Sequence, residues 1–468
     1  MTSAHRAPSG QGLIADLRTL LGDDAVLAPA APYLADTTEE EGLSGDAGAV
    51  ALPASTTEVS RLLAWSDQHE VAIVPRGGGT GVAGGAVPFD GAVVLSLERL
   101  RAIRSFEPQL WRIHVEAGLR TAELKRLARD NGLLFAPDPG AGEQSQIGGN
   151  IATNAGGPHA FKYGVTGSWV TGLEAVLASG EVITVGGPIR KDVAGYDLRS
   201  LLVGSEGTLA VITAAWLKLI PAPELALPVV ALYPDTAAGC TAIERVVASG
   251  LAVAALDYLD ERSIELAGRS FPVALPAAGG FMVLADADGS EAEARRLQAE
   301  VIDALGETAS WLHAPQARGD VEALWRWRDG ASMPIAAHLG GKLSEDIVVP
   351  LDRLAEAIDE TLAIGARHQL DACSWGHAGD GNLHSTLLLA RNDAAQRERA
   401  SAAAEDLFAL AVRLGGSVSG EHGLGWVKSG QLARQWSPAA LELHAAVKRT
   451  FDPKNLLNPG KKLALIPR

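Results

Sequence analysis

Pro75-Arg76-Gly77-Gly78-Gly79-Thr80-Gly81-Val82-Ala83-Gly84-Gly85 follows an apolar segment at residues 71–74 that is typical of a β-strand. Part of it, Gly79 to Gly84, has the Gly-x-Gly-x-x-Gly spacing of dinucleotide-binding loops. That fingerprint requires a helix to begin at the loop and an acidic residue about twenty positions later. Further glycines and Pro88 exclude the helix, and an apolar strand resumes at residues 93–97. The sequence therefore predicts a loop whose backbone N–H groups can surround a pyrophosphate, and not a Rossmann fold.

Two further segments consist of small residues with hydroxyl and amide side chains. They are Gln144-Ser145-Gln146-Ile147-Gly148-Gly149-Asn150-Ile151-Ala152-Thr153-Asn154-Ala155-Gly156-Gly157 and Gly204-Ser205-Glu206-Gly207-Thr208-Leu209. Such residues can approach an extended dinucleotide closely and bond its phosphates and ring edges. Three segments of this kind favour a nucleotide site over a purely structural role for the glycines.

The remaining pattern predicts an α+β protein. A strand at residues 49–53 precedes a capping box from Ser55 to Glu58 and an amphipathic helix. Residues 172–220 are predominantly β in pattern, and a proline-rich linker begins at Pro221. Beyond it, apolar strands alternate with helices at 236–248, 291–305 and 351–368. We therefore expect a second α+β domain, followed by a C-terminal segment with a helix at 438–451.

Composition restricts the class of protein. The chain has 468 residues, 47% hydrophobic and 21% charged, with a net charge of −16, so we expect a globular protein that does not bind nucleic acid. The two cysteines, Cys240 and Cys373, form no disulfide framework and fit a reducing compartment. We find no secretion signal and no apolar run of membrane-spanning length, and we expect a cytoplasmic protein without a transmembrane segment.

Histidines gather in a second informative run. Gly376-His377-Ala378-Gly379-Asp380-Gly381-Asn382-Leu383-His384 is followed, about thirty-five residues later, by Ser419-Gly420-Glu421-His422-Gly423. The two imidazoles of the first run and Glu421 are mixed N/O ligands that zinc, manganese or iron accept, with positions left open for substrate. His422 remains as a base beside the metal. The glycines indicate loops at strand ends, which disfavours a helical His-Glu-x-x-His hydrolase.

Together, the three small-residue segments resemble the FAD-binding domain of the vanillyl-alcohol oxidase and p-cresol methylhydroxylase superfamily. The histidine run and residues 419–423 resemble the FAD-dependent D-2-hydroxyacid dehydrogenases, which include D-2-hydroxyglutarate, D-lactate and glycolate enzymes. The resemblance extends over residues 45–465. It implies a two-subdomain FAD-binding domain at 1–222, an α+β substrate-binding domain with an antiparallel sheet at 223–415, and a C-terminal segment at 416–468 that packs back near the flavin.

The resemblance also assigns roles to individual residues. It implies zinc or manganese on His377, His384 and Glu421, and His422 as the catalytic base. It implies non-covalent FAD, because Thr80 stands where covalent members often have histidine. The cofactor-binding residues would be Pro75, Arg76, Gly77, Gly78, Gly79, Thr80, Gly81, Val82, Pro137, Gly140, Ser145, Gly148, Gly149, Asn150, Thr153, Glu206, Gly207, Ile212 and Asn458.

The substrate is expected to be anionic, so cations should surround it. By resemblance, Arg328, Ser332, Lys342 and Thr386 bind substrate. Ser332 and Thr386 depart from the Thr and Asn expected in hydroxyglutarate enzymes. Two cations suit a dicarboxylate, so D-2-hydroxyglutarate is the leading expectation and D-lactate or another D-2-hydroxyacid the alternative.

Two other classes remain open at this stage. One is a metal-dependent hydrolase in which His377, His384 and Glu421 act on water. The other is a flavin-binding electron-transfer subunit without substrate chemistry of its own. For the dehydrogenase, the electron acceptor would be a quinone or an electron-transfer flavoprotein. The sequence does not fix the oligomeric state, and a homodimer is compatible with it.

Overall fold

The glycine-rich loop connects two parallel strands, β3 (Ile73–Arg76) and β4 (Ala92–Ser96). Residues 77–91, all of which the structure describes, contain no helix. A Rossmann arrangement is therefore absent from this part of the chain, as the sequence predicted. The loop instead returns directly to the sheet from which it left.

This computed structural model describes residues 10–38, 43–276 and 279–463. The first nine residues of the expected FAD-binding domain and the last five of the C-terminal segment lie outside these ranges. The chain forms two compact units. The first contains Met1–Gly156, Val165–Ala222 and Glu421–Arg468, and the second contains Gly157–Gly164 and Pro223–Gly420.

The first unit contains a four-stranded sheet in the order β1-β2-β4-β3, in which β1 is antiparallel to its neighbour. Helix α3 begins because the Ser55 side chain accepts the backbone N–H of Glu58, as the predicted cap requires. Val59, Leu62 and Leu63 on its buried face join the apolar core with residues of α1 and the sheet. These elements are β1 (Val26–Leu27), β2 (Ala47–Ala51), α1 (Gln11–Leu21), α2 (Ala31–Leu34) and α3 (Thr56–His69).

A five-stranded antiparallel sheet in the order β5-β6-β10-β8-β9 completes most of this unit. Its strands are β5 (Ile103–Glu107), β6 (Arg112–Glu116), β8 (Val170–Val176), β9 (Val182–Gly186) and β10 (Val211–Lys218). A small sheet pairs β7 (Leu133–Leu134) with β11 (Ile220–Pro221). The helices are α4 (Thr121–Asp130), α5 (Ile147–Thr153), α7 (Leu198–Leu202), α15 (Leu432–Gln435) and α16 (Pro438–Phe451).

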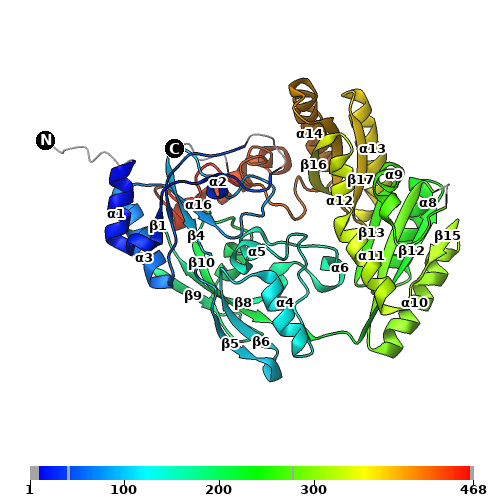
Figure 1. Ribbon diagram of the computed structural model, residues 1–468, viewed down its shortest axis with the longest axis horizontal. Coiled ribbons are helices and arrows are strands. Elements are labelled where there is room, and N and C mark those ends of the chain that lie inside the picture. The colour runs from blue at the N-terminus through cyan, green and yellow to red at the C-terminus, as the bar shows by residue number, and fades with distance from the viewer. Residues whose placement is uncertain (1–9, 39–42, 277–278, 464–468) are drawn as a thin grey trace. The chain divides into compact units, whose positions relative to one another are not determined.

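The second unit is built on a seven-stranded antiparallel sheet in the order β15-β12-β14-β13-β17-β18-β16 (Figure 1). The strands are β12 (Leu225–Tyr233), β13 (Ala255–Asp260), β14 (Phe281–Gly289), β15 (Trp311–His313), β16 (Gly340–Val348), β17 (Asp371–His377) and β18 (Asn382–Ala390). The α+β class with an antiparallel sheet, expected from the sequence, is confirmed.

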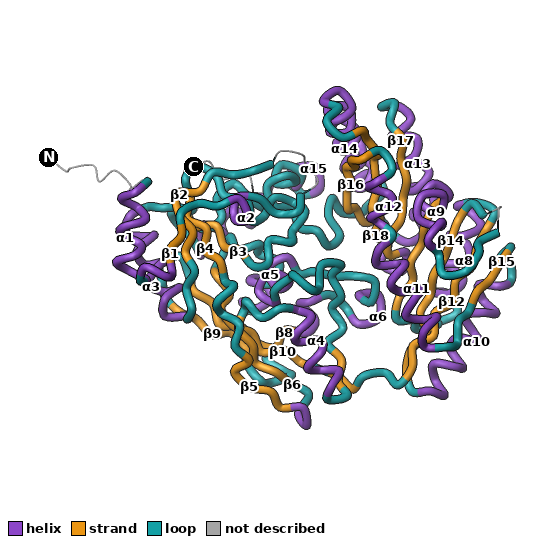
Figure 2. Tube along the Cα trace, in the orientation of Figure 1, coloured by secondary structure: helices purple, strands orange, loops and turns teal. Residues whose placement is uncertain are grey.

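Helices lie against both faces of this sheet (Figure 2). Helices α10 (Glu291–Gly306), α8 (Thr236–Ala248), α13 (Leu354–Arg367) and α14 (Ala394–Arg413) pack on strands β12, β14, β16, β17 and β18. Apolar side chains of α9 (Glu261–Ala267) and α11 (Arg318–Gly330) cover Leu259, Met282 and Leu284. Two shorter helices, α6 (Ala160–Tyr163) and α12 (Ser332–Ala337), belong to the same unit.

No helix within the described ranges combines the length and the apolar character that crossing a bilayer requires.

Candidate functional site

One face of the seven-stranded sheet carries a row of polar side chains. Because side chains alternate along a strand, the cross-strand register decides which residues share a face. Trp375 lies opposite His384, which in turn lies opposite Asp346. The face continues with His377 and with Asp257 of β13. Asp286 and Asp288 (β14), Asn382 and Thr386 (β18), and Lys342 and Ser344 (β16) also lie on it.

His377 is held by a buried carboxylate. Its ring Nδ1 lies 2.9 Å from Oδ1 of Asp257, and the side chains of these residues are almost completely shielded from solvent. Burial opposes ionisation of Asp257, but the charges of Arg328 and His377 outweigh it and lower the pKa of this carboxyl to about 2. The carboxylate therefore favours the tautomer in which Nδ1 of His377 carries the proton, and in that tautomer the lone pair lies on Nε2.

His384 is positioned by aromatic packing. Its ring centroid lies 4.4 Å from that of Trp375 and 5.5 Å from that of His377, and the two imidazoles meet nearly edge to face. The His384 side chain is 4% exposed. The structure thus brings together both histidines that the sequence proposed as ligands.

Asp346 fixes the turn that precedes Glu421 and His422. Its carboxylate accepts hydrogen bonds from the backbone N–H of Gly420 at 2.8 Å and from Ser419 Oγ at 3.0 Å. Asn382 donates to the other oxygen at 2.6 Å. Residues 420–422 form a bend, and residues 419–424 contain no strand. In a straight strand Glu421 and His422 would face opposite ways, so the bend allows both to approach His384.

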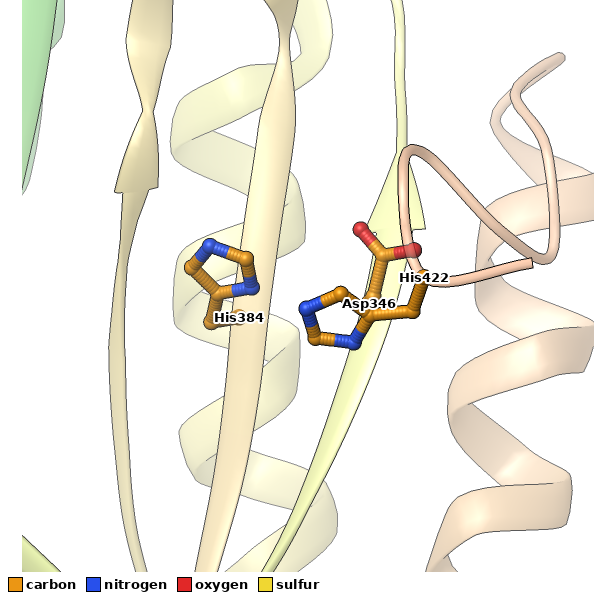
Figure 3. Close-up of side chains that lie close together, drawn as sticks. All are labelled: Asp346, His384 and His422. Carbon is orange, nitrogen blue, oxygen red and sulfur yellow. The ribbon is translucent and has the colours of Figure 1, made fainter. Parts of the chain in front are cut away.

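Two groups of side chains could each hold a metal ion. In each group, the three ligand atoms lie within 4.8 Å of one another. The first group is His377, His384 and Glu421, and the second is Asp346, His384 and His422. Figure 3 shows the second set, with His384 on a strand and His422 on the turn beside Asp346. Two imidazoles and a carboxylate match the donor preferences of zinc and manganese. The residues present therefore fit a divalent cation.

Arg328, predicted to bind substrate, contacts an acidic residue of the protein. Its Nη2 lies 2.6 Å from Oδ2 of Asp257, outside hydrogen-bonding geometry, and its side chain is 6% exposed. The guanidinium also lies over the ring of Trp375, 5.4 Å from its centroid. Its charge is thus balanced within the protein.

The other three predicted substrate residues are placed differently. Lys342 and Thr386 share the polar face, and the buried Thr386 hydroxyl lies 2.9 Å from Ser344 Oγ. Ser332 lies just beyond the helix of Arg328, because α11 ends at Gly330 and Ser332 begins α12.

The acidic end of the face is covered by residues 157–164. His159 Nε2 lies 3.8 Å from Asp286, while Lys162 and Tyr163 both hydrogen-bond Asp288. Four buried strand atoms on the face have no hydrogen-bond partner among the described residues: Asp257 Oδ2, Asp286 Oδ1, Trp375 Nε1 and Asn382 Oδ1. Since buried polar atoms are normally paired, their presence on one face is consistent with a polar ligand or bound water there.

In the first unit, the three small-residue segments converge. A Cβ added to Gly77 would lie 3.3 Å from Gly149 Cα, and one added to Gly78 would lie 2.3 Å from the backbone oxygen of Gln144. A Cβ on Gly207 would lie 3.0 Å from the ring of Pro75. A side chain at Gly78 would force the loops apart, and one at Gly77 or Gly207 would be tightly packed, which favours glycine at these contacts.

Several predicted cofactor residues support these loops through hydrogen bonds. Asn150 Nδ2 donates to Thr121, whose hydroxyl lies 2.8 Å from Ser145 Oγ, and Thr153 donates to the Gly149 carbonyl. Arg76 donates to the carbonyls of Ala35 and Pro32, and Ile212 is buried in β10. Of the described residues here, Ser205 Oγ and Gln146 Oε1 are buried without a hydrogen-bond partner. A cradle of close backbones with unpaired buried atoms fits a dinucleotide.

The C-terminal segment is fastened to this cradle. Asn458 donates to the carbonyls of Gly85 and Glu206. The Glu206 carboxylate accepts the backbone N–H groups of Leu424 and Gly425 and pairs with Lys462. Both residues therefore join chain segments at the cradle, whatever contact each also makes with a cofactor.

Comparison with known proteins decides the family. The family model described as "FAD linked oxidases, C-terminal domain" matches residues 222–462. The family model described as "FAD binding domain" matches residues 47–186. The chain belongs to the FAD-linked oxidases. FAD as cofactor and oxidoreductase as enzyme class follow from this membership, which favours them over the hydrolase alternative.

Curated relatives support the assignment. The chain is 36% identical to "Glycolate oxidase subunit GlcD" of Bacillus subtilis, over 89% of each chain. It is 32% identical to "D-lactate dehydrogenase" of Anaerostipes hadrus, over 87% of each. It is 35% identical to "D-2-hydroxyglutarate dehydrogenase" of Xanthomonas citri pv. viticola, over 88% of each.

A solved structure shares the fold. The crystal structure of p-cresol methylhydroxylase with substrate bound superimposes with a TM-score of 0.81 at 18% identity, covering 97% of each chain. The vanillyl-alcohol oxidase type of fold expected from the sequence is thereby confirmed.

Sequence reasoning missed Asp257 and Asp346. Each left a weak signal in its strand. Asp257 interrupts the otherwise apolar Ala255-Leu256, and Asp346 continues an alternation of polar residues from Lys342 through Ser344. An acidic residue inside a buried strand normally needs a partner, and this could have marked both.

Proposed function

We propose that this chain oxidises a D-2-hydroxyacid to the 2-oxoacid, with FAD and a divalent metal. The observation that carries the proposal is the convergence of ligand atoms from His377, His384 and Glu421, in a chain of the FAD-linked oxidase family. The names of the curated relatives support it, since all three act on 2-hydroxyacids.

Each group has a distinct task. FAD supplies the hydride acceptor. His377, His384 and Glu421 would hold a divalent metal, which would supply a Lewis acid for the substrate hydroxyl. His422 then accepts the hydroxyl proton while hydride leaves C2, and the two losses together give the 2-oxoacid.

Asp346 has a supporting task in this scheme. It accepts the hydrogen bonds that shape residues 419 and 420, and so it orients Glu421 and His422. Because the chain bends here, the adjacent residues Glu421 and His422 can serve as metal ligand and base, respectively.

For the substrate, we propose a short monocarboxylate, either glycolate or D-lactate. The argument for a dicarboxylate required two free cations, and Arg328 is paired with the ionised Asp257. Asp286 and Asp288 add further carboxylates to the same face. D-2-hydroxyglutarate is the second candidate, favoured by Lys342 on that face and by the relative of that name.

An anaerobic screen of bound-flavin bleaching tests the proposal. The panel contains glycolate, the two enantiomers of lactate and the two of 2-hydroxyglutarate. We expect bleaching by glycolate and D-lactate in preference to D-2-hydroxyglutarate, and none by the L-enantiomers. Faster reduction by D-2-hydroxyglutarate would select the second candidate. Reduction by none of them would refute the proposed reaction.

A further inference from the structure

The carboxylate of Asp257 contacts two side chains that have different predicted roles. One contact is to His377 Nδ1 at 2.9 Å, and the other is to Arg328 Nη2 at 2.6 Å. Asp257 lies on a central strand of the sheet and has no exposed surface. Isolated buried charges are strongly disfavoured, so Asp257 and Arg328 depend on each other.

Arg328 also reaches the second histidine through an aromatic ring. Its guanidinium lies over Trp375, and the other neighbour of Trp375 is the imidazole of His384. One guanidinium is thus linked to His377 through Asp257 and to His384 through Trp375. All five side chains belong to the second unit.

We propose that Arg328 and Asp257 form a buried support that orients His377 and His384 as metal ligands. Arg328 is accordingly a positioning residue for these ligands. This inference rests on the metal of the proposed function.

Hydrogen-bond chemistry explains the effect on His377. When Nδ1 of His377 donates to the Asp257 carboxylate 2.9 Å away, the lone pair of the imidazole lies on Nε2. A carboxylate behind a metal-bound imidazole fixes its tautomer and orientation and makes it a better donor to the metal. Loss of such a partner typically weakens metal binding by about 10–100-fold.

A purely structural ion pair is the competing explanation, and a double substitution separates the two. Asp257→Asn alone leaves Arg328 buried without a counter-charge, which can destabilise the fold. The combination of Asp257→Asn with Arg328→Gln removes both charges and relieves that penalty. If the pair were only structural, the double variant would recover stability and metal affinity together.

Asp288→Asn provides the matched control. Asp288 is also a buried carboxylate on the same face, and it is paired with Lys162, but it contacts no proposed ligand. Its substitution should change stability without changing metal affinity.

The experiment is a competition titration of the FAD-loaded protein with zinc and a chelating indicator, repeated with manganese. Thermal unfolding is recorded for each variant. We expect the dissociation constant to rise about 10–100-fold in Asp257→Asn and to stay raised in the double variant, while Asp288→Asn matches the wild type. A wild-type metal affinity in the double variant would overturn this inference but not the proposed function. A wild-type protein that binds neither metal would refute the proposed metal, and the inference with it.

Discussion

The Asp346 carboxylate accepts the backbone N–H of Gly420 at 2.8 Å, directly before the two residues proposed as ligand and base. The same carboxylate also accepts from Ser419 and Asn382. A strand residue thus determines the backbone path at Glu421 and His422. Sequence spacing gave no sign of this contact, because the partners are more than seventy residues apart.

Asp346→Asn should disturb that path. An amide has one accepting oxygen where the carboxylate has two, so it cannot accept all three hydrogen bonds. We expect loss of bound metal and of turnover with FAD content unchanged, measured by elemental analysis and flavin absorbance. Asp371→Asn is the control, because Asp371 is a strand carboxylate that pairs with Arg262. Full metal content in Asp346→Asn would contradict this role.

His422→Asn tests the base. The variant should keep FAD and metal, because His422 is not a member of the ligand set with His377 and Glu421. Turnover should fall by about 10²–10⁴-fold, the usual contribution of general base catalysis. His368→Asn, which removes a histidine bonded to Asp406, should have normal turnover. A near-normal kcat in His422→Asn would exclude the proposed role, and loss of metal would instead favour the ligand set of Asp346, His384 and His422.

Gly78→Ala tests the FAD cradle. The added methyl group would lie 2.3 Å from the backbone oxygen of Gln144, so the two loops would have to separate. We expect a loss of about 1–3 kcal/mol in stability and weaker FAD retention, measured by thermal unfolding and flavin release. Gly85→Ala is the matched control in the same loop, because no atom lies within 4 Å of its added Cβ. Equal FAD retention in the two variants would contradict the close approach.

Lys461 gives a prediction about pH. Burial lowers the pKa of its amine from 10.5 to about 7, against the opposing charges of Asp36 and Glu206. Between these values the unfolded chain binds a proton that the folded chain does not, so stability should rise with pH.

Lys461→Met removes this dependence. Urea unfolding of both proteins at about pH 6.5 and about pH 9.5 should show the wild type gaining stability relative to the variant at the higher pH. A constant difference, or a loss at the higher pH, would show that the amine keeps its charge in the folded protein.

Local patterns predicted much of the fold. Helices α8 and α16 have the bounds expected from apolar periodicity and turn residues, and glycines with Pro88 correctly excluded a helix after β3. These features depend on neighbours in the chain, which a single sequence displays directly.

Tertiary partners were harder to predict. The three histidines were recognisable from their glycine-rich surroundings, but the pairing of Arg328 with Asp257 joins residues of α11 and β13. Whether an arginine is free for substrate depends on such a partner, and the sequence of α11 holds no information about it. The strand order β13-β17-β18-β16 places Asp257 and Asp346 on the face of His377 and His384, and it follows from packing of the whole sheet.

The central claim is that metal and flavin act on the same D-2-hydroxyacid. The most direct measurement is the anaerobic rate of flavin reduction in metal-free protein and in the same protein reconstituted with zinc or manganese, using the acid that reduces wild type fastest. The account predicts reduction only after reconstitution, with FAD content equal in both samples. Equal rates with and without metal would contradict it.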